Sequence, residues 1–341
     1  MMLQHSTKIL FIFTLTSGVL ISVSSNSWLG AWMGLEISLL SFIPLMISTK
    51  NMLMAEASMK YFIIQAIASS VLMFSIIMSF TFKEMLFYNS YSSMILINSP
   101  LLLKSGAAPL HWWLPSVMEG SSWMNCFMLL TTQKMAPLML ISYSLQMNWF
   151  SMMIIFLSVC IGSIGGMTQT SIRKILAYSS INHMGWMLAA MLISETTWLT
   201  YFSIYSLLTL TIVTMVMPFQ VSFINQTFSA WSEMPMLKFM MFTTLLSLGG
   251  LPPFLGFLPK WMVIQLMIMN DMSFMITIMV ILSLVTLYYY MRLCYSSFMI
   301  NSHQLKWNNQ FSKGNITYLS MFLTSISITG LVMCTLMFNN I

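Results

Sequence analysis

The sequence predicts an all-α, polytopic membrane protein with about eleven transmembrane helices. Of its 341 residues, 58% are hydrophobic and only 6% are charged, and the mean hydropathy is +0.84. Apolar stretches of about 20 residues, the length that spans a bilayer as a helix, recur along the whole chain. No connecting stretch is long enough for a soluble domain. We therefore predict a single transmembrane domain over 1–341.

Eleven apolar segments can be placed in order along the chain. They are 8–23, 28–47, 58–80, 94–113, 123–143, 150–167, 172–192, 197–220, 237–269, 274–298 and 316–338. Because consecutive helices cross in alternate directions, the connections between them lie alternately on the two sides of the membrane. Tryptophan and tyrosine near the segment ends read as anchors at the membrane interface.

Basic residues divide unevenly between the two sides that this count defines. Nine fall on the side of the N-terminus, namely Lys8, Lys50, Lys60, Arg173, Lys174, Lys238, Arg292, Lys306 and Lys313, against Lys83 alone on the other. Lys and Arg concentrate on the cytoplasmic or matrix side of membrane proteins. This predicts an N-terminus in the cytoplasm or mitochondrial matrix and a C-terminus on the opposite side.

Two of the segments are interrupted by glycine and proline in a related way. They read KSGAAPLHWWLP from Lys104 and GGLPPFLGFLPK from Gly249, and four positions match at a constant separation of 144 residues. The segments are five helices apart, so they cross in opposite directions. This predicts an inverted five-helix repeat, 8–143 and 150–299, within an antiporter-like core over 8–299, followed by an extra helix over 316–338.

Proline removes a backbone donor, so both interrupted helices should be discontinuous within the membrane. Exposed backbone at that depth survives only beside water or protein, and broken helices at matching positions of two halves indicate a transport site. The alternative is that these prolines only kink helices for packing. Glycine pairs at GxxxG spacing, Gly30 with Gly34 and Gly162 with Gly166, predict close helix contacts.

Four ionisable residues lie inside predicted spans: Glu36, Lys104, Lys134 and Lys260. Each costs about 2.5 to 3.5 kcal/mol at the centre of a spanning helix. Burial favours the neutral amine, while a nearby carboxylate favours the ammonium. A buried lysine beside a movable charge is therefore a proton switch, and we predict that these residues carry protons.

Other functional classes find no support in the residues. The basic residues are scattered singly, so no nucleic-acid groove is predicted. The four cysteines, Cys126, Cys160, Cys294 and Cys334, are isolated and have no histidine at ligand spacing, so we expect no metal or iron–sulfur site. No glycine-rich dinucleotide fingerprint follows a strand. We expect no cofactor and no directly bound NADH in this chain.

Four segments together resemble the antiporter-like membrane subunits of respiratory complex I. They are GAWMGLE ending at Glu36, the stretch from Leu103 to Trp113, RKILAYSSINHMGW from Arg173, and the stretch from Gly249 to Trp261. The resemblance implies a proton-pumping subunit of the membrane arm, with NADH oxidation and ubiquinone reduction carried out by other subunits. It also implies partners, namely other membrane-arm subunits, accessory subunits and lipids such as cardiolipin, in the mitochondrial inner membrane.

The same resemblance assigns roles to the buried charges. Glu36 matches the acidic residue that responds to the neighbouring subunit, and Lys104 matches its partner. Lys134, in TQKMAP, matches the connecting lysine, and Lys260 the lysine of the second broken helix. Most family members have fourteen helices, so three are absent from the N-terminal flank of this chain.

His111 lies beyond the first break and His183 lies in the seventh segment, and either is a candidate for a proton path or a hydrogen-bonded packing element. Two other functions stay open at this stage. One is a stand-alone cation/proton antiporter. The other is a structural or assembly subunit that does not pump, for which the buried lysines would have no use.

Overall fold

The structure is a computed structural model that describes residues 2–48, 51–82, 90–224, 226, 235–299 and 315–339. The described residues are almost entirely helical, with one isolated antiparallel bridge between Ser171 and Phe223. Lys50, Lys83, Lys306 and Lys313, which enter the charge count above, lie outside the described residues. The predicted orientation of the termini therefore stays a prediction.

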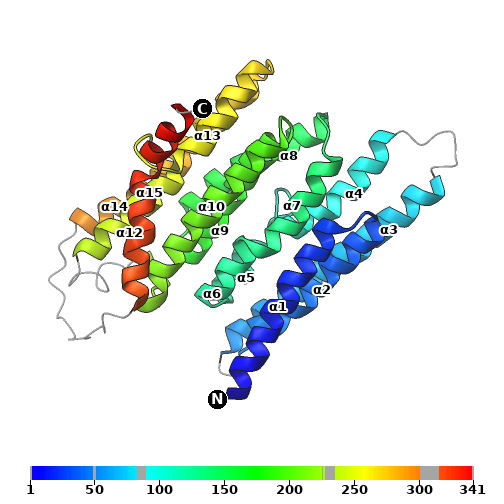
Figure 1. Ribbon diagram of the computed structural model, residues 1–341, viewed down its shortest axis with the longest axis horizontal. Coiled ribbons are helices and arrows are strands. Elements are labelled where there is room, and N and C mark those ends of the chain that lie inside the picture. Colours follow the sequence, from blue (N-terminus) through cyan, green and yellow to red (C-terminus); the bar gives the residue numbers. More distant parts are fainter. Residues whose placement is uncertain are drawn as a thin grey trace. The chain divides into compact units, whose positions relative to one another are not determined.

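The chain forms two compact units, Met1–Ser158 and Val159–Ile341. The first unit holds α1 (Met2–Ser24), α2 (Trp28–Met46), α3 (Met52–Phe82), α4 (Ser90–Ser105), α5 (Trp113–Gly120), α6 (Trp123–Leu130) and α7 (Thr132–Ser144). Helices α1 to α4 pack in sequence order, and α7 packs against α1, α2 and α4 (Figure 1). Helix α5 lies on α3.

The second unit is built around α9. Its elements are the end of α8 (Trp149–Met167), α9 (Ile172–Met191), α10 (Glu195–Val216), the 3-10 turn η1 (Met217–Phe219), α12 (Pro235–Gly249), α13 (Phe257–Met269), α14 (Ser273–Met299) and α15 (Asn315–Asn339). Helices α10, α13 and α14 all contact α9. Almost every residue of α9 is buried, although the helix carries serine, asparagine and histidine. It is therefore an internal polar helix in an apolar unit.

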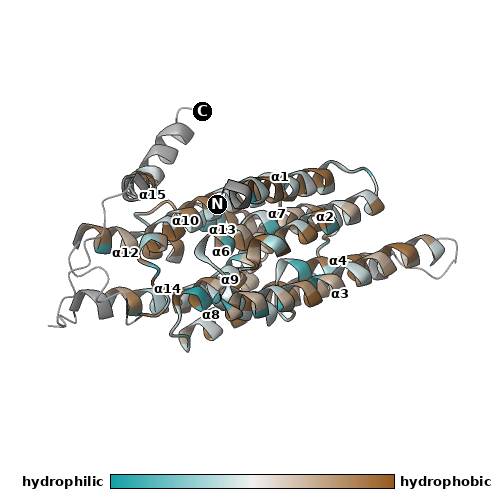
Figure 2. Cartoon of the chain, turned by 90° about the horizontal axis from the view of Figure 1, so that it is seen from below, coloured by the Kyte–Doolittle hydropathy of each residue, from teal (hydrophilic) through white to brown (hydrophobic). Residues whose placement is uncertain are grey.

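Apolar residues dominate the outer faces of these helices, as a membrane requires (Figure 2). Among the described residues, six helices are long and apolar enough to cross a membrane: α1, α2, α3, α8, α10 and α14. Shorter apolar helices include parts of α4, α12, α13 and α15. Large apolar side chains such as Phe13, Leu40 and Phe322 are exposed, which is favourable in lipid and not in water. The predicted fold class is confirmed.

The two predicted breaks occupy equivalent positions. Helix α4 ends at Ser105 and α5 begins at Trp113, while α12 ends at Gly249 and α13 begins at Phe257, so every boundary keeps the separation of 144 residues. The first residue after each half-helix is a glycine with positive φ, +76° at Gly106 and +80° at Gly250. Only glycine adopts that conformation at little cost. The two discontinuous helices are thus confirmed.

A third interruption was not predicted. The segment expected as one helix over 123–143 is divided at Thr131, between α6 and α7, where ψ is −76°. Thr131 and Thr132 direct their hydroxyls back to the carbonyls of Phe127 and Met128, at 2.8 Å each. Such side-chain bonds to the preceding turn bend helices. The two adjacent threonines have low helix propensity, but the apolar pattern on both sides continues without a break, so the span was predicted as one helix.

Close helix contacts depend on small residues. Of the two predicted glycine pairs, the first differs from the prediction, because only one of its two glycines lies at a helix contact. A Cβ on Gly34 would lie 2.5 Å from the backbone nitrogen of Ser22, and one on Gly18 would lie 2.8 Å from that of Ser38. Gly34 therefore fixes the α1–α2 contact, whereas Gly30 faces Ser25 of the preceding loop. In the second unit Gly162 meets the backbone of Asn182, and Gly166 meets the ring of Tyr289.

The second break offers a stability test. A Cβ on Gly256 would lie 1.8 Å from the carbonyl oxygen of Ser247, whereas one on Gly249 meets nothing closer than 3.5 Å. We expect Gly256→Ala to destabilise the protein by about 2 to 3 kcal/mol through overpacking, and Gly249→Ala to be tolerated. Thermal unfolding and the yield of assembled complex measure both. Equal stability of the two variants would contradict the close approach of these half-helices.

Candidate functional site

Glu36, which is half-buried with its Oε2 atom buried, and the buried Lys104 form the first pair of charges. Glu36 lies on α2 and Lys104 on the last turn of α4, where it is 6% exposed. The two charges lie within electrostatic range but do not form a contact below 4 Å. Neither Glu36 Oε2 nor Lys104 Nζ has a hydrogen-bond partner within the described part of the chain. The two side chains are close enough for an electrostatic interaction, but no direct ion pair fixes the distance between them.

Neutral side chains satisfy the backbone at the first break. Trp113 Nε1 donates to the carbonyl oxygen of Leu103 at 3.0 Å, and Gln65 Nε2 donates to that of Lys104 at 3.4 Å. The last carbonyls of a helix have no partner within it and need donors from elsewhere. Because an indole and an amide supply those donors, the ammonium of Lys104 is not used for capping.

Lys134 lies at the start of α7, immediately after the interruption at Thr131. It is 2% exposed, and its Nζ lacks a hydrogen-bond partner among the described residues. The neighbouring Gln133 donates from Nε2 to the carbonyl of Ser38 at 3.3 Å, which joins α7 to α2 two residues beyond Glu36. Helix α7 also packs on α4. The first unit thus gathers three of the predicted charges on mutually packed helices.

His111 lies within the first break and is buried. Its Nδ1 lies 3.1 Å from the carbonyl oxygen of Pro109. A carbonyl only accepts, so Nδ1 carries the proton of that bond. The imidazole stacks on Trp112 with 5.0 Å between ring centroids. The break therefore holds this histidine in one orientation.

Lys260 lies in the first turn of α13, on the other side of the second break. Its Nζ donates to the carbonyl oxygen of Gly249, the last residue of α12, at 3.0 Å. The positive φ of Gly250 brings the backbone close, because a Cβ there would lie 3.1 Å from the same Nζ. Lys260 Nζ also lies 5.8 Å from the ring centroid of Trp186, in cation–π range.

The two breaks are alike in backbone and differ in the donor that caps the half-helix. The first half-helix is capped by the indole of Trp113, and the second by the ammonium of Lys260. A cation at a helix C-terminus also interacts favourably with the helix dipole. Lys260 is therefore held in place by backbone, whereas Lys104 has no such bond and lies within electrostatic range of Glu36.

His183 lies near Lys260 in the second unit. Its Nδ1 lies 2.9 Å from the hydroxyl of Tyr201 on α10. Trp186, which faces Lys260, follows His183 by one helical turn on α9. The structure therefore places His183 and Lys260 in one unit, and Glu36, Lys104, Lys134 and His111 in the other.

Several residues at these sites were missed by sequence reasoning. Gln65 is an isolated amide in the middle of the apolar segment 58–80. A polar side chain in such a place is a signal that could have identified it as a candidate site residue. Trp113 was read with other tryptophans as an interfacial anchor, but it is a capping donor at the break. No signal in the sequence pairs either residue with α4.

No metal centre is evident in the described part of the chain, where no group of three or more histidine, cysteine, aspartate or glutamate side chains gathers. Cys126, Cys160 and Cys294 form no disulfide in the described part of the chain. The side chain of Cys334 lies outside the described residues. The absence of a cofactor stays a prediction.

Comparison with known proteins supports these observations. The family model described as NADH:quinone oxidoreductase/Mrp antiporter, TM, matches residues 25–286, and that of the NADH dehydrogenase subunit 2 C-terminus matches residues 287–338. The chain is 54% identical to NADH-ubiquinone oxidoreductase chain 2 of Anopheles gambiae, over 96% of this chain and 97% of that one. It is 53% identical to the protein of the same name from Aedes aegypti, over 99% of both.

The chain belongs to the NADH-ubiquinone oxidoreductase chain 2 family. Its predicted resemblance to the membrane subunits of complex I is thereby confirmed. More distant members of this family, such as chain 2 of Ovis aries, are 39% identical over 88% of this chain and 89% of theirs.

Solved structures share the chain 2 fold at low identity. A chain of respiratory complex I from Thermus thermophilus matches with a TM-score of 0.81 and 21% identity, over 95% of this chain and 78% of that one. A chain of the Mrp complex from Dietzia sp. DQ12-45-1b matches with a TM-score of 0.79 and 15% identity, over 96% and 75%. At such identities the likeness concerns the fold.

The neutral cap at the first break can be tested with adjacent tryptophans. Trp113→Phe removes the donor to Leu103, and we expect a loss of about 1 kcal/mol in stability because a buried carbonyl is left unpaired. Trp112, which is 78% exposed, provides the control, and Trp112→Phe should leave stability unchanged. Thermal unfolding of the assembled complex measures both. An effect of Trp112→Phe as large as that of Trp113→Phe would refute the capping role.

Proposed function

We propose that the chain is a proton-translocating membrane-arm subunit of NADH:ubiquinone oxidoreductase in the mitochondrial inner membrane, with redox chemistry confined to other subunits. Family membership supports the assembly and the membrane. The observation that carries the pumping role is the burial of three lysines, of which Lys104 and Lys134 have no hydrogen-bond partner in the described chain. Buried charges are costly in a membrane and mark ion pathways.

The proposed proton path starts at Glu36 and Lys104. While Glu36 is ionised and near, it stabilises the ammonium of Lys104. When the attraction weakens, an N–H bond of Lys104 breaks and its proton passes, through water, to the neutral amine of Lys134. The path continues towards Lys260. Once protonated, Lys260 donates again to the carbonyl oxygen of Gly249. Every lysine gains one proton for each that it releases, so no net charge accumulates.

The partners follow from this assignment. They are other membrane-arm subunits, accessory subunits and lipids such as cardiolipin, and the exposed apolar faces of α1 to α3 suit lipid or protein contact. From the distribution of Lys and Arg, we propose an N-terminus in the matrix and a C-terminus in the intermembrane space.

A stand-alone cation/proton antiporter is a second candidate, favoured by the fold shared with the Mrp complex chain. It predicts ion exchange by the isolated chain in liposomes. The proposed subunit requires its redox partners and predicts none. A non-pumping scaffold is the third candidate, and the same lysine variants test it.

The decisive experiment replaces each buried lysine by methionine in the assembled complex. Lys104→Met, Lys134→Met and Lys260→Met remove the charge and keep a side chain of similar length. Lys134 and Lys260 have no carboxylate partner in the described chain, whereas Lys104→Met leaves Glu36 without its counter-charge, a change that destabilises buried pairs. Assembly of each variant is therefore measured beside its proton yield. We expect fewer protons translocated per NADH oxidised, or a coupled loss of turnover, measured in sealed vesicles.

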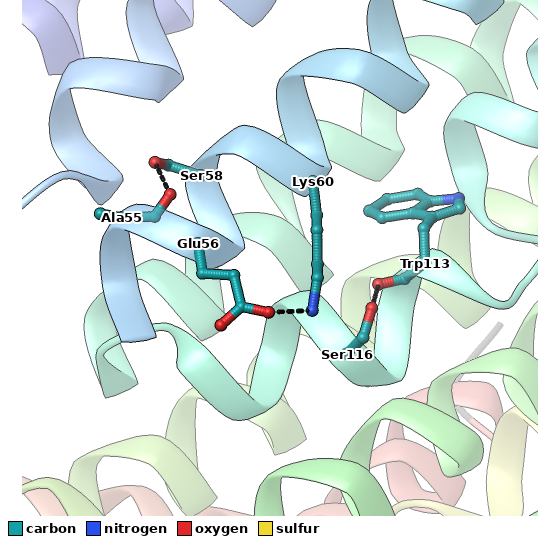
Figure 3. Close-up of polar contacts among 6 residues, drawn as sticks. All are labelled: Ala55, Glu56, Ser58, Lys60, Trp113 and Ser116. Carbon is teal, nitrogen blue, oxygen red and sulfur yellow. Dashed lines mark hydrogen bonds and ion pairs between the residues drawn. The ribbon is translucent and has the colours of Figure 1, made fainter. Parts of the chain in front are cut away.

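Lys60 supplies the matched control. It is 47% exposed on α3 and pairs with Glu56 one turn earlier at 2.6 Å, beside α5 (Figure 3). Exposed ion pairs of this kind contribute about 0 to 1 kcal/mol, so Lys60→Met should keep the normal proton yield. Normal yield in all three buried-lysine variants would establish the scaffold instead of the pump.

A further inference from the structure

Four buried tyrosines gather around α9 in the second unit and have no place in the proton path described so far. They are Tyr201 and Tyr205 on α10 and Tyr289 and Tyr290 on α14. All four are at most 3% exposed. They lie well inside their helices and not at the helix ends where tyrosine serves as an interfacial anchor. We call them the tyrosine cluster.

The cluster follows α9 step by step. The hydroxyl of Tyr290 is directed towards Ser179, and that of Tyr205 towards Ser180. Tyr201 lies 2.9 Å from His183 Nδ1. The rings of Tyr205 and His183 are 5.2 Å apart between centroids. Successive polar groups along α9 thus each face a tyrosine.

One end of the cluster lies close to Lys260. His183 precedes Trp186 by one turn, and Trp186 lies under the ammonium of Lys260 at 5.8 Å. From Ser179 to Trp186 the rise along α9 is about 10 Å. The cluster therefore covers the stretch of α9 that leads to this lysine.

The other end lies close to the surface. The ring of Tyr289 contacts Gly166, the second-last residue of α8. Arg292, one turn further along α14, is exposed and donates to the carbonyl of Gln169, in the loop between α8 and α9, at 3.4 Å. Tyr289, at this end of the tyrosine cluster, therefore lies one helical turn from an exposed arginine.

The hydroxyls inside the cluster face polar groups without closing good hydrogen bonds to them. Those of Tyr205, Tyr289 and Tyr290 face Ser180, Tyr290 and Ser179, but none has a partner at hydrogen-bond distance and angle among the described residues. A buried hydroxyl left without a partner costs about 1 to 3 kcal/mol. Three such hydroxyls around one helix would be a large penalty, and native proteins relieve such penalties with ordered water.

We propose that the tyrosine cluster, with water between its hydroxyls, conducts protons from the surface at the α8–α9 loop through His183 to Lys260. Each hydroxyl accepts a proton from the water on its outer side and releases its own proton inwards. The final step forms an N–H bond on the neutral amine of Lys260 as an O–H bond of the adjacent water breaks. The inference rests on the proposed function and adds a route of access to Lys260 separate from Lys104 and Lys134.

The test removes hydroxyls and keeps rings. In the assembled complex, the double variant Tyr205→Phe, Tyr290→Phe should lower the proton yield per NADH, or the coupled turnover, by at least half of the loss seen with Lys260→Met. Tyr288 on the same helix is 57% exposed, so Tyr288→Phe is the matched control and should behave as the parent protein.

A dry cluster predicts a different result. Replacing unpartnered hydroxyls by hydrogen would then leave pumping intact and raise thermal stability. Normal yield in the double variant, together with a loss in Lys260→Met, would overturn the relay and leave the proposed function standing. Normal yield in Lys260→Met would overturn the relay, and normal yield in all three lysine variants would remove the proposed function as well.

If the double variant does not assemble, two other measurements test the proposed relay. The single variants Tyr205→Phe and Tyr290→Phe should each lower the proton yield. A density map of the parent complex that resolves water should place a molecule between the hydroxyls of Tyr205 and Ser180. Direct packing of those groups with no water between them would overturn the proposal.

Discussion

The structure depends on the cost of leaving backbone carbonyls unpaired inside a membrane. Two half-helices, α4 and α12, end within apolar segments, next to glycines with positive φ. Their last carbonyls therefore need hydrogen-bond donors from outside the helix. Trp113 and Gln65 supply them in the first unit, and Lys260 supplies one in the second. The identity of these donors decides what each lysine is able to do.

A neutral cap leaves Lys104 available to Glu36. Because the indole of Trp113 and the amide of Gln65 occupy the carbonyls, the buried ammonium of Lys104 is left to interact with a carboxylate that it does not touch directly. Lys260 is different, since its donor bond to Gly249 competes with any transfer of its proton. The two breaks share their backbone and differ in the ease with which their lysines change state.

The cost of unpaired polar groups inside a membrane applies to the side chains around α9 as well. An internal helix with Ser179, Ser180 and His183 is unfavourable unless each polar atom finds a partner. Tyrosine is suited to this position because its ring fills apolar space while its hydroxyl both donates and accepts. Ser179 and Ser180 donate to carbonyls one turn back, and His183 pairs with the hydroxyl of Tyr201. The other hydroxyls of the tyrosine cluster are left for the water of the proposed relay.

The sequence by itself determined the fold class, the two discontinuous helices and the three buried lysines. Helix length and glycine–proline patterns are local, and the cost of a charge in lipid holds wherever the neighbours lie, so these features follow from composition and spacing. The matching motifs, 144 residues apart, predicted a break within each motif, and the helix boundaries at Trp113 and Phe257 keep the same separation.

Only the tertiary structure decided which groups meet. The interruption at Thr131, the caps from Gln65 and Trp113, and the contact of Lys260 with Gly249 and Trp186 all join residues whose proximity depends on how helices pack. The tyrosine cluster has the same origin, since α10 and α14 are far apart in sequence and meet only around α9. Contacts between distant segments are set by side-chain shape across helix interfaces, and a single sequence does not record that shape.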